Sequence, residues 1–483
     1  MPTTSPRRLA SVLVSLLSLV APQMVSSQSA TYDVVIANGR VMDPESGLDA
    51  PRNIGVSAGT IRAISASKLT GKRTIDATGM VVSPGFIDLH QHGQDDESNR
   101  LKVRDGVTSS FELEVGTDDV DRWYADHAGK SLLNYGVSIG HIAVRMHVMH
   151  DAGGLLPNGP AKDNVATPAD REAIRQGIRR GLARGAVAVG MGISYTLAAS
   201  PDEIVDVFRE AKGTHASVHV HAGRGGLEKW RELTFEEPFA AAQLTGVPLH
   251  MVHVNSVAVE AMPQFLRMIA EARSRHLDVT TELYPYTASQ TSIQSALYDV
   301  YENVDDSVYA RLLWPATGER LTRETFHKYR KTGGMVVNFM MSEDMIRLAL
   351  RDSIPMIASD GGITNGVGHP RVAGTFSRVL GRYVREEKTL GLMDALRKMT
   401  LMPAERLAPR VAEMKQRGRL KVGAIADIVV IDAAHVIDRA TYEKPGTPSE
   451  GIPFVLVNGV PVVSDGKVVE GVLPGRPVRA PLK

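Results

Sequence analysis

The sequence predicts an α/β protein in which a (β/α)8 TIM barrel carries a small β-sandwich formed from both chain ends. Three observations support this fold class. Strand-like runs with tight-turn signals occupy residues 31–82 and 415–483. Between them, over residues 83–408, apolar runs alternate with stretches of helical periodicity. No glycine-rich nucleotide fingerprint follows the first strand of this region, which disfavours an open doubly wound sheet.

Composition excludes several classes of function. The 483 residues include 55 Lys+Arg and 54 Asp+Glu, which gives a formal net charge of +1. Such a balance, without a long basic run, argues against nucleic acid as a partner. The chain has no cysteine, so disulfides, cysteine-ligated zinc and thiol nucleophiles are excluded.

The N-terminus has the pattern of a secretory signal peptide, expected over residues 1–28. Arg7 and Arg8 precede the apolar run Leu9–Ala21, and small residues follow at 26–30. The run is shorter than the about 20 apolar residues that span a bilayer. We therefore expect cleavage near Ser27, export to the periplasm or the medium, and no stable membrane anchor afterwards.

Both ends of the mature chain carry hairpin signals. Asn38-Gly39 interrupts the apolar run that begins at Val34, and Asn458-Gly459 and Asp465-Gly466 divide the run near the C-terminus. Two short β-rich segments that bracket a large α/β region are expected to pair with each other into one sandwich.

The middle of the chain contains helix starts followed by strand-like runs. Thr167-Pro168 and the capping-box pattern Ser200-Pro201-Asp202-Glu203 each precede an apolar helical stripe. Strands are expected at Ala186–Gly190, Ala216–His221, Pro248–His253, Asp278–Leu283 and Pro355–Asp360. Repeated βα units of this kind indicate a parallel sheet closed as a barrel.

The first barrel strand ends with the pair His90 and His92. Because side chains alternate across a strand, both imidazoles point to the same side. Neutral imidazole is a common ligand for zinc and related ions. Two hydrogen-bonded core histidines are the alternative for an isolated His-x-His pair.

Recurrence favours the metal interpretation. Further possible ligands stand at the ends of later expected strands: Glu114, His221, His253 and Asp360. The ends of all barrel strands meet on one rim, so these groups are expected to converge with His90 and His92. Glu112 shares a strand face with Glu114, and the choice between the two carboxylates stays open.

The chain resembles the amidohydrolase superfamily and, within it, the D-aminoacylase or N-acyl-D-amino-acid deacylase group. The resemblance rests on these segments: Tyr32–Gly39, the run from Pro84-Gly85-Phe86 to His92, Asp105–Thr108, Tyr284–Ala288, Ser359–Gly361 and His369–Tyr383. It implies a metal-dependent barrel capped by a β-sandwich, with one or two metal ions, usually zinc.

The resemblance also implies a distribution of ligands. His90 and His92 would hold one ion, His221 and His253 the other, and Glu114 would bridge them, with Asp360 as a further ligand. Better-known D-aminoacylases have a cysteine near the position of Glu114, and the carboxylate here favours a binuclear centre. A carboxylated lysine bridge is unsuited, because no lysine occurs between Ala186 and Ala211.

Two catalytic residues and three substrate contacts are expected. Asp360 would act as general base and then general acid, and Tyr284 would polarise the scissile carbonyl and contact the substrate. Arg371 and Arg145 would bind a substrate α-carboxylate through the planar guanidinium group. A core tyrosine and structural ion pairs are the respective alternatives. Related enzymes often have a lysine where this chain has Asn255.

We therefore predict a secreted, zinc-dependent amidohydrolase that cleaves N-acyl amino acids, possibly of D configuration, or small dipeptide-like amides by metal-activated water. A cyclic-amide hydrolase of the dihydroorotase or hydantoinase kind is the alternative enzyme, and a catalytically inactive barrel acting as a binding module is the alternative outside enzymes. The segment Thr287–Ser342 is expected to form a lid or rim insertion over the site.

Overall fold

The structure is a computed structural model that describes residues 1–5, 31–224 and 234–483. The predicted signal peptide, residues 1–28, lies outside the described residues apart from its first five positions. Within the described part of the chain, no helix has both the length and the apolar character needed to cross a bilayer.

The centre of the molecule is a parallel eight-stranded sheet, as the sequence predicts. Its strands follow one another in chain order around the sheet. They are β6 (Phe86–Asp88), β7 (Val107–Thr117), β8 (Asn134–Gly140), β9 (Val189–Gly192), β10 (Val218–His221), β11 (Leu249–Met251), β12 (Val279–Leu283) and β17 (Pro355–Ile357). Several of these strands are shorter than predicted, so four of the predicted ligands lie just beyond the strand ends: His90, His92, His253 and Asp360.

The sheet closes into a barrel through the segments that follow β6 and β17. The backbone N–H of Asp360 donates to the carbonyl of His90 at 2.7 Å, and that of His92 donates to the carbonyl of Gly361 at 2.9 Å. These bonds join the segments that follow the first and last strands, on the side where the predicted ligands lie. The closure thus fixes the His90–His92 segment against Asp360.

Most helices cover the outside of the barrel, whereas those within residues 288–342 belong to an insertion between β12 and β17. The longer ones are α1 (Asp96–Arg104), α2 (Val120–His127), α3 (His141–Val148), α5 (Pro168–Ala183), α6 (Pro201–Ala211), α7 (Glu236–Thr245), α9 (Met262–Ser274), α11 (Arg323–Thr332), α12 (Glu343–Arg351), α13 (Arg371–Arg378) and α14 (Leu392–Met399). Shorter ones are α4 (Pro160–Asp163), α8 (Val254–Ala258), α10 (Asp306–Tyr309), α15 (Leu401–Leu407), η1 (Ile193–Tyr195), η3 (Val259–Ala261), η4 (Ala296–Tyr301), η6 (Ala412–Gln416) and the π-helix η5 (Val379–Glu386).

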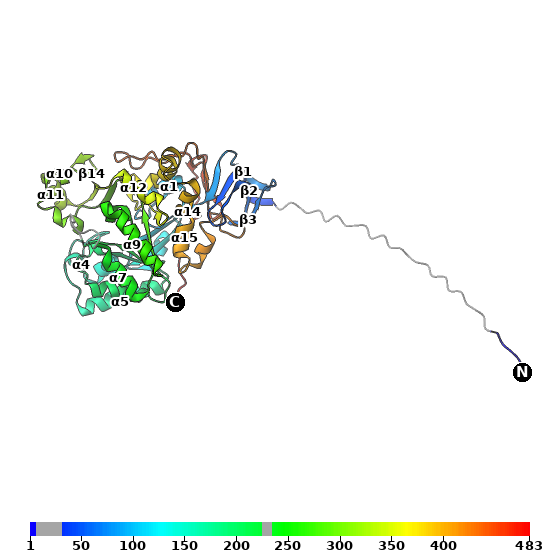
Figure 1. The fold of residues 1–483 in the computed structure, drawn as a ribbon, viewed down its shortest axis with the longest axis horizontal. Coiled ribbons are helices and arrows are strands. Elements are labelled where there is room, and N and C mark those ends of the chain that lie inside the picture. The colour runs from blue at the N-terminus through cyan, green and yellow to red at the C-terminus, as the bar shows by residue number, and fades with distance from the viewer. Residues whose placement is uncertain (6–30, 225–233) are drawn as a thin grey trace.

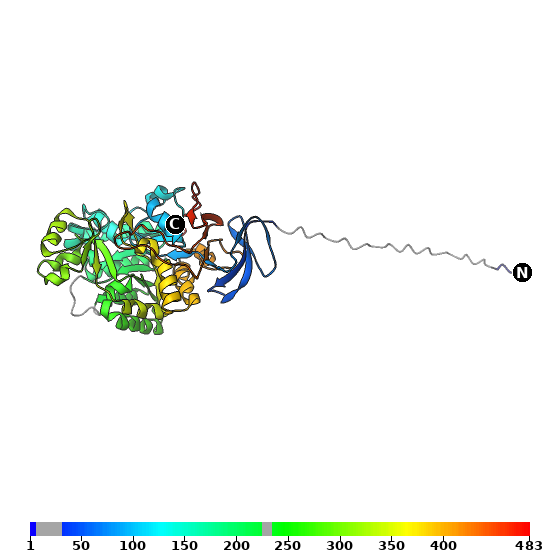
Figure 2. The same cartoon turned by 90° about the horizontal axis from the view of Figure 1, so that it is seen from above.

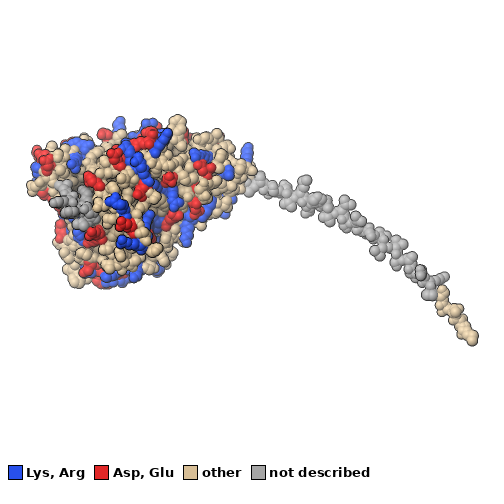
Figure 3. Space-filling view, viewed as in Figure 1, with Lys and Arg blue, Asp and Glu red and all other residues tan. Residues whose placement is uncertain are grey.

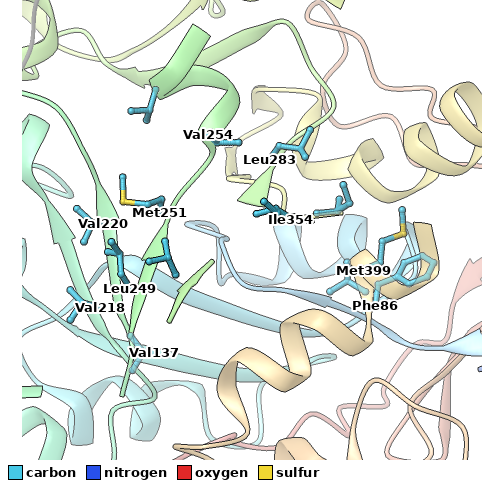
Figure 4. Close-up of a cluster of buried hydrophobic side chains, with 14 of the residues drawn as sticks. Phe86, Val137, Val218, Val220, Leu249, Met251, Val254, Leu283, Ile354 and Met399 are labelled. Atoms are coloured by element: carbon cyan, nitrogen blue, oxygen red, sulfur yellow. The ribbon is translucent and has the colours of Figure 1, made fainter. Parts of the chain in front are cut away.

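Strand alternation separates the apolar core from the polar interior of the barrel. Val218 and Val220 of β10 are buried in the main apolar cluster beside Leu249 and Met251 of β11 (Figure 4). The intervening residues of β10 therefore face the other way, which brings His221 to the inside of the barrel.

Strands from both chain ends form one separate nine-stranded sheet, in agreement with the prediction that the two ends pair. They are β1 (Thr31–Asp43), β2 (Leu48–Ser57), β3 (Thr60–Ser65), β4 (Thr70–Asp76), β5 (Val81–Pro84), β20 (Ile428–Ile431), β21 (Phe454–Val457), β22 (Val460–Ser464) and β23 (Lys467–Val468). The antiparallel pair β5–β20 joins the N-terminal and C-terminal strands. An apolar cluster that includes Ile54 and Ile428 fills this part.

The chain between β12 and β17 contains an insertion that includes α10 and α11. It lies at the opposite end of the molecule from β1, β2 and β3 (Figures 1 and 2). It contains a four-stranded sheet of β13 (Ala288–Ser292), β16 (Met335–Phe339), β14 (Leu312–Trp314) and β15 (Glu319–Arg320). A small hairpin of β18 (Ile363–Thr364) and β19 (Val367–Gly368) follows β17.

The helix starts agree with the predicted caps in one case and differ in the other. Thr167 and Asp170 form a complete capping box at α5. At α6 the Ser200 side chain accepts from the Glu203 N–H, but the Glu203 carboxylate does not complete the box. That carboxylate instead contacts His141 and Arg145 in the interior.

The face of the molecule seen in Figure 3 has interspersed acidic and basic side chains.

Candidate metal centre and active site

The ends of the barrel strands bring together two overlapping sets of possible metal ligands. His90, His92, Glu114 and Asp360 form one set, and Glu114, His221 and His253 form the other. Within each set the ligand atoms lie within 4.8 Å of one another. Glu114 belongs to both sets, so the two sites would share a carboxylate.

The Nε2 atoms of His90 and His92 both face Oε2 of Glu114. The two Nε2 atoms are 3.3 Å apart, and they lie 3.1 and 3.2 Å from Oε2 of Glu114. Because β6 ends at Asp88, both histidines lie in the segment after the strand and not on it, but their rings still converge as the His-x-His spacing predicts.

Glu114 lies between the two histidine pairs. Its Oε2 faces His90 and His92, while its Oε1 lies 2.5 Å from Nδ1 of His221 and 3.6 Å from Nε2 of His253. Glu112 sits elsewhere, with Oε2 at 2.6 Å from Nδ1 of His92. The geometry thus puts Glu114, and not Glu112, in the bridging position.

Asp360 approaches the cluster from the segment after β17. Its Oδ1 is 3.2 Å from Nε2 of His92 and 3.5 Å from Nε2 of His90. Its backbone has a φ of +52°, an unusual conformation for a residue other than glycine. Such conformations persist where surrounding contacts hold them, and they concentrate at functional sites.

Outer partners orient three of the four imidazoles. Glu282 accepts from Nδ1 of His90 at 2.6 Å, and Glu112 accepts from Nδ1 of His92 at 2.6 Å. Ser256 places its Oγ 3.0 Å from Nδ1 of His253. A partner on one ring nitrogen leaves the other free to face a metal, which is the usual arrangement around metal-binding histidines.

The electrostatics of the cluster fit a cation. Burial alone would lower the pKa of His90, but Asp360, Glu282 and Glu114 outweigh burial and raise it well above its usual value. Burial acts to raise the pKa of Glu114, but His221 and His90 hold it well below the usual value. Several carboxylates packed around imidazoles in a buried site create a strong local demand for positive charge.

A cavity of about 370 Å³ opens beside this cluster. His92, Glu114, His221, His253 and Asp360 line one side of it. Residues 289–292 of the insertion and the loop 154–158 line other parts. The volume is in the range of small-molecule sites. The segment Thr287–Ser342 thus contributes wall to the cavity.

Comparison with known proteins agrees with this geometry. An amidohydrolase family profile matches residues 140–463. An N-acyl-D-glutamate deacylase of Alcaligenes xylosoxydans xylosoxydans is 30% identical, over 89% of this chain and 93% of its own. The chain belongs to the amidohydrolase family.

Solved amidohydrolase structures extend the match to the fold. An N-acyl-D-glutamate deacylase of Bordetella bronchiseptica, in complex with zinc and a phosphonate mimic of the tetrahedral intermediate, is similar with a TM-score of 0.78 at 26% identity, over 93% of this chain and all of its own. A D-aminoacylase studied for its binuclear metal centre has a TM-score of 0.79 at 25% identity, over the same shares. Family membership supports metal-dependent hydrolysis of an amide bond by this amidohydrolase.

Tyr284 and Arg371 lie behind the cluster and do not line the cavity. The Arg371 Nη1 atom is 2.8 Å from Oδ2 of Asp360, and its guanidinium carbon is 4.6 Å from the centre of the Tyr284 ring. The Tyr284 hydroxyl is buried and makes no hydrogen bond with the described residues. Both residues are thus next to Asp360, and each has unused hydrogen-bonding capacity.

Arg145 forms the structural ion pair that is the alternative to binding a substrate carboxylate. It is buried, and its Nη1 contacts both carboxylate oxygens of Glu203. Its Nε and Nη2 donate to the carbonyls of Ala161 and Asn164 at 2.8 and 2.6 Å. Because these partners occupy the guanidinium and it does not line the cavity, the expected contact with a substrate carboxylate is replaced by an internal ion pair.

The sequence interpretation missed Glu282 and the wall of the cavity. Glu282 is the second-last residue of β12, so it occupies the same kind of strand-end position as the predicted ligands. That signal could have found Glu282. The neutral side chains of the insertion, such as Gln290 and Asn338, have no motif that would mark them as lining residues.

Proposed function

We propose that the protein hydrolyses the amide bond of N-acyl amino acids, or of small dipeptide-like amides, at a zinc centre of one or two ions. The observation that carries this proposal is the sharing of Glu114 by two sets of buried ligands at the mouth of the cavity. Relatives that act on N-acyl-D-glutamate support the amide class.

The donor set suits zinc. Imidazole nitrogens and carboxylate oxygens are its usual ligands outside cysteine sites, and the described cluster offers both kinds. His90, His92 and Asp360 would hold one ion, His221 and His253 the other, and Glu114 would contribute to both. Bound zinc lowers the pKa of water to near neutrality and polarises a carbonyl.

Asp360 is suited to move the proton during hydrolysis. It lines the cavity, and Arg371 and His90 hold its pKa far below the usual value despite burial. It is therefore ionised at neutral pH, but so low a pKa makes it a weak base, and its basicity would have to rise on substrate binding for it to accept a proton from the attacking water. The same oxygen then donates that proton to the departing amine nitrogen, which completes the cleavage.

Arg371 and Tyr284 are the candidates for substrate contact. Arg371 is the cation beside Asp360, and its fork geometry suits an α-carboxylate. Tyr284 has a buried hydroxyl to donate, and donors of this kind stabilise a developing oxyanion. Neither side chain lines the cavity as described, so contact with the substrate would require Arg371 to leave Asp360 or the Tyr284 side chain to move into the cavity.

Export is part of the proposal. The Arg7-Arg8 pair and the apolar run Leu9–Ala21 support a cleaved signal peptide. N-terminal sequencing of protein recovered from the periplasm or the medium would give a start near residue 28. A mature protein that retains Met1 in the cytoplasm would contradict export.

A substrate panel tests the reaction. Zinc-loaded protein would be incubated with N-acetyl D- and L-amino acids, dipeptides, a hydantoin and dihydroorotate, and the released amine or opened ring would be measured. Hydrolysis of acyl amino acids or dipeptides supports the proposal. Ring opening alone would reassign the protein to cyclic amides, and inactivity on every substrate would favour a binding module.

A further inference from the structure

Two buried side chains, Asp88 and Ser359, join the first barrel strand to the segment that carries Asp360. Asp88 is the last residue of β6, Ser359 lies between the end of β17 and Asp360, and both are 0% exposed. Neither is among the described residues that line the cavity or form the ligand sets. Any effect of these two residues on the site therefore passes through the groups that they hold.

The Asp88 carboxylate divides its two oxygens between backbone groups and a cation. Its Oδ1 accepts from the backbone N–H of His90 at 3.2 Å and from that of Ser359 at 3.0 Å. Its Oδ2 accepts from Nζ of Lys102, which is also buried, at 2.8 Å. The lysine thus fixes the rotation of the carboxylate, and the other oxygen joins the segments that follow β6 and β17.

The Ser359 hydroxyl adds a second connection between these segments. Its Oγ donates to the backbone carbonyl of His90 at 3.1 Å and accepts from the N–H of Gly361 at 3.1 Å. The N–H of Asp360 donates to the same His90 carbonyl at 2.7 Å. The three consecutive N–H groups of residues 359–361 are therefore all bound.

These bonds surround a residue with an unusual backbone conformation. Asp360 has a φ of +52°, and such a conformation at a residue other than glycine persists where the surrounding structure over-determines it. With this backbone, Oδ1 of Asp360 lies 3.2 Å from Nε2 of His92 and 3.5 Å from Nε2 of His90. The bonds that fix the backbone thus also fix the direction of the carboxylate.

We propose that Asp88 and Ser359 are positioning residues, which hold Asp360 in the conformation that presents its carboxylate to the ion shared with His90 and His92. The inference rests on the proposed function and deepens it by assigning residues that set the geometry of the metal centre. Because both residues act through Asp360, their effect on zinc binding should disappear when the Asp360 carboxylate is removed.

A double-mutant cycle between Ser359 and Asp360 tests the inference. Zinc affinities would be measured by chelator competition for the wild type, Ser359→Ala, Asp360→Ala and the double variant. The affinity that Asp360→Ala lowers identifies the ion concerned. Ser359→Ala is expected to weaken this affinity about tenfold when Asp360 is present and no more than about twofold in the Asp360→Ala background. Equal factors in both backgrounds, or no weakening by Ser359→Ala, would overturn the inference.

Ser131→Ala is the matched control. Ser131 is 4% exposed, and its hydroxyl also donates to one backbone carbonyl and accepts from one backbone N–H, both of Leu133. It lies before β8 and outside both ligand sets. This variant is expected to lower the melting temperature about as much as Ser359→Ala and to leave zinc affinity unchanged. An equal loss of zinc affinity in both serine variants would refute a specific positioning role.

Two substitutions of Asp88 separate its backbone bonds from its ion pair. In the Lys102→Met background, Asp88→Asn retains an oxygen for the two N–H groups, whereas Asp88→Leu has the same branching and no acceptor. The asparagine variant is expected to keep the wild-type zinc affinity within about threefold, and the leucine variant to bind at least about tenfold more weakly. A larger loss in the asparagine variant, or equal affinities in the two variants, would contradict the role of Asp88.

Failure of the proposed function gives a different pattern in the same measurements. If the wild type binds no zinc, or if Asp360→Ala leaves every zinc affinity unchanged, the proposed metal centre is itself wrong. If Asp360→Ala weakens zinc binding and Ser359→Ala does not, the metal centre stands and the positioning role alone is refuted.

Discussion

Glu282→Gln gives a sharp test of how the barrel interior prepares the metal site. Glu282 is 1% exposed, and its two oxygens contact Nδ1 of His90 at 2.6 Å and Nε2 of His250 at 3.1 Å. Glutamine has nearly the same shape, but it removes the negative charge and turns one of the two acceptors into a donor. His90 or His250 then loses its acceptor.

The expected loss follows from the bond to His90. A hydrogen bond to a charged group contributes about 1.5–3 kcal/mol, which corresponds to about 10–100-fold in a dissociation constant. Loss of outer partners of metal-binding histidines weakens metal binding by a similar factor. Zinc affinity, measured by competition with a chromophoric chelator, is therefore expected to fall about 10–100-fold in Glu282→Gln.

Glu203→Gln is the matched control. Glu203 is equally buried at 1% exposed and also accepts from a histidine, His141, at 2.7 Å, but it lies outside the ligand cluster. This variant is expected to lower the free energy of unfolding and to leave zinc affinity unchanged. Wild-type zinc affinity in Glu282→Gln, or an equal loss in both variants, would refute the positioning role of Glu282.

Three further predictions concern proton transfer, metal binding and stability. Asp360→Asn is expected to lower kcat about 10²–10⁴-fold and, because it leaves the buried Arg371 without its counter-charge, to lower stability as well; full activity in the folded variant would contradict its role as base. Surrounding carboxylates raise the pKa values of His90 and His92 against the effect of burial, so zinc must displace protons and should bind more weakly as pH falls; calorimetry in buffers of different ionisation enthalpy should detect proton release, and its absence would count against these shifts. Lys102→Met breaks the buried ion pair with Asp88 at 2.8 Å and should cost about 3–5 kcal/mol in urea denaturation, whereas wild-type stability would show that the pair is dispensable.

The strand-end ligands could be predicted because they depend on local rules. Alternation predicts one shared face for His90 and His92, and their rings converge although β6 already ends at Asp88; parallel strands present their ends on one rim. These rules hold without knowledge of distant contacts. The choice of Glu114 over Glu112 needed coordinates, because it depends on the register between β7 and its neighbours, which shifts beyond Glu112.

Other features depend on contacts between distant segments and left little trace in the sequence. Arg145 and Glu203 are 58 positions apart in the sequence. Their ion pair occupies the Arg145 guanidinium and takes the Glu203 carboxylate away from the capping box at α6. Their identities alone do not distinguish an ion pair from a substrate contact. The wall of the cavity likewise arises from how the insertion folds over the barrel, and ordinary residues such as Gln290 contribute to it.

The central claim is that the two ligand sets bind zinc. Anomalous diffraction at the zinc edge from crystals of the zinc-loaded protein measures this directly. The account predicts one or two peaks within about 2.0–2.2 Å of donor atoms from His90, His92, Glu114, His221, His253 and Asp360. Zinc bound at other residues, or no peak in this cluster at saturating zinc, would contradict it.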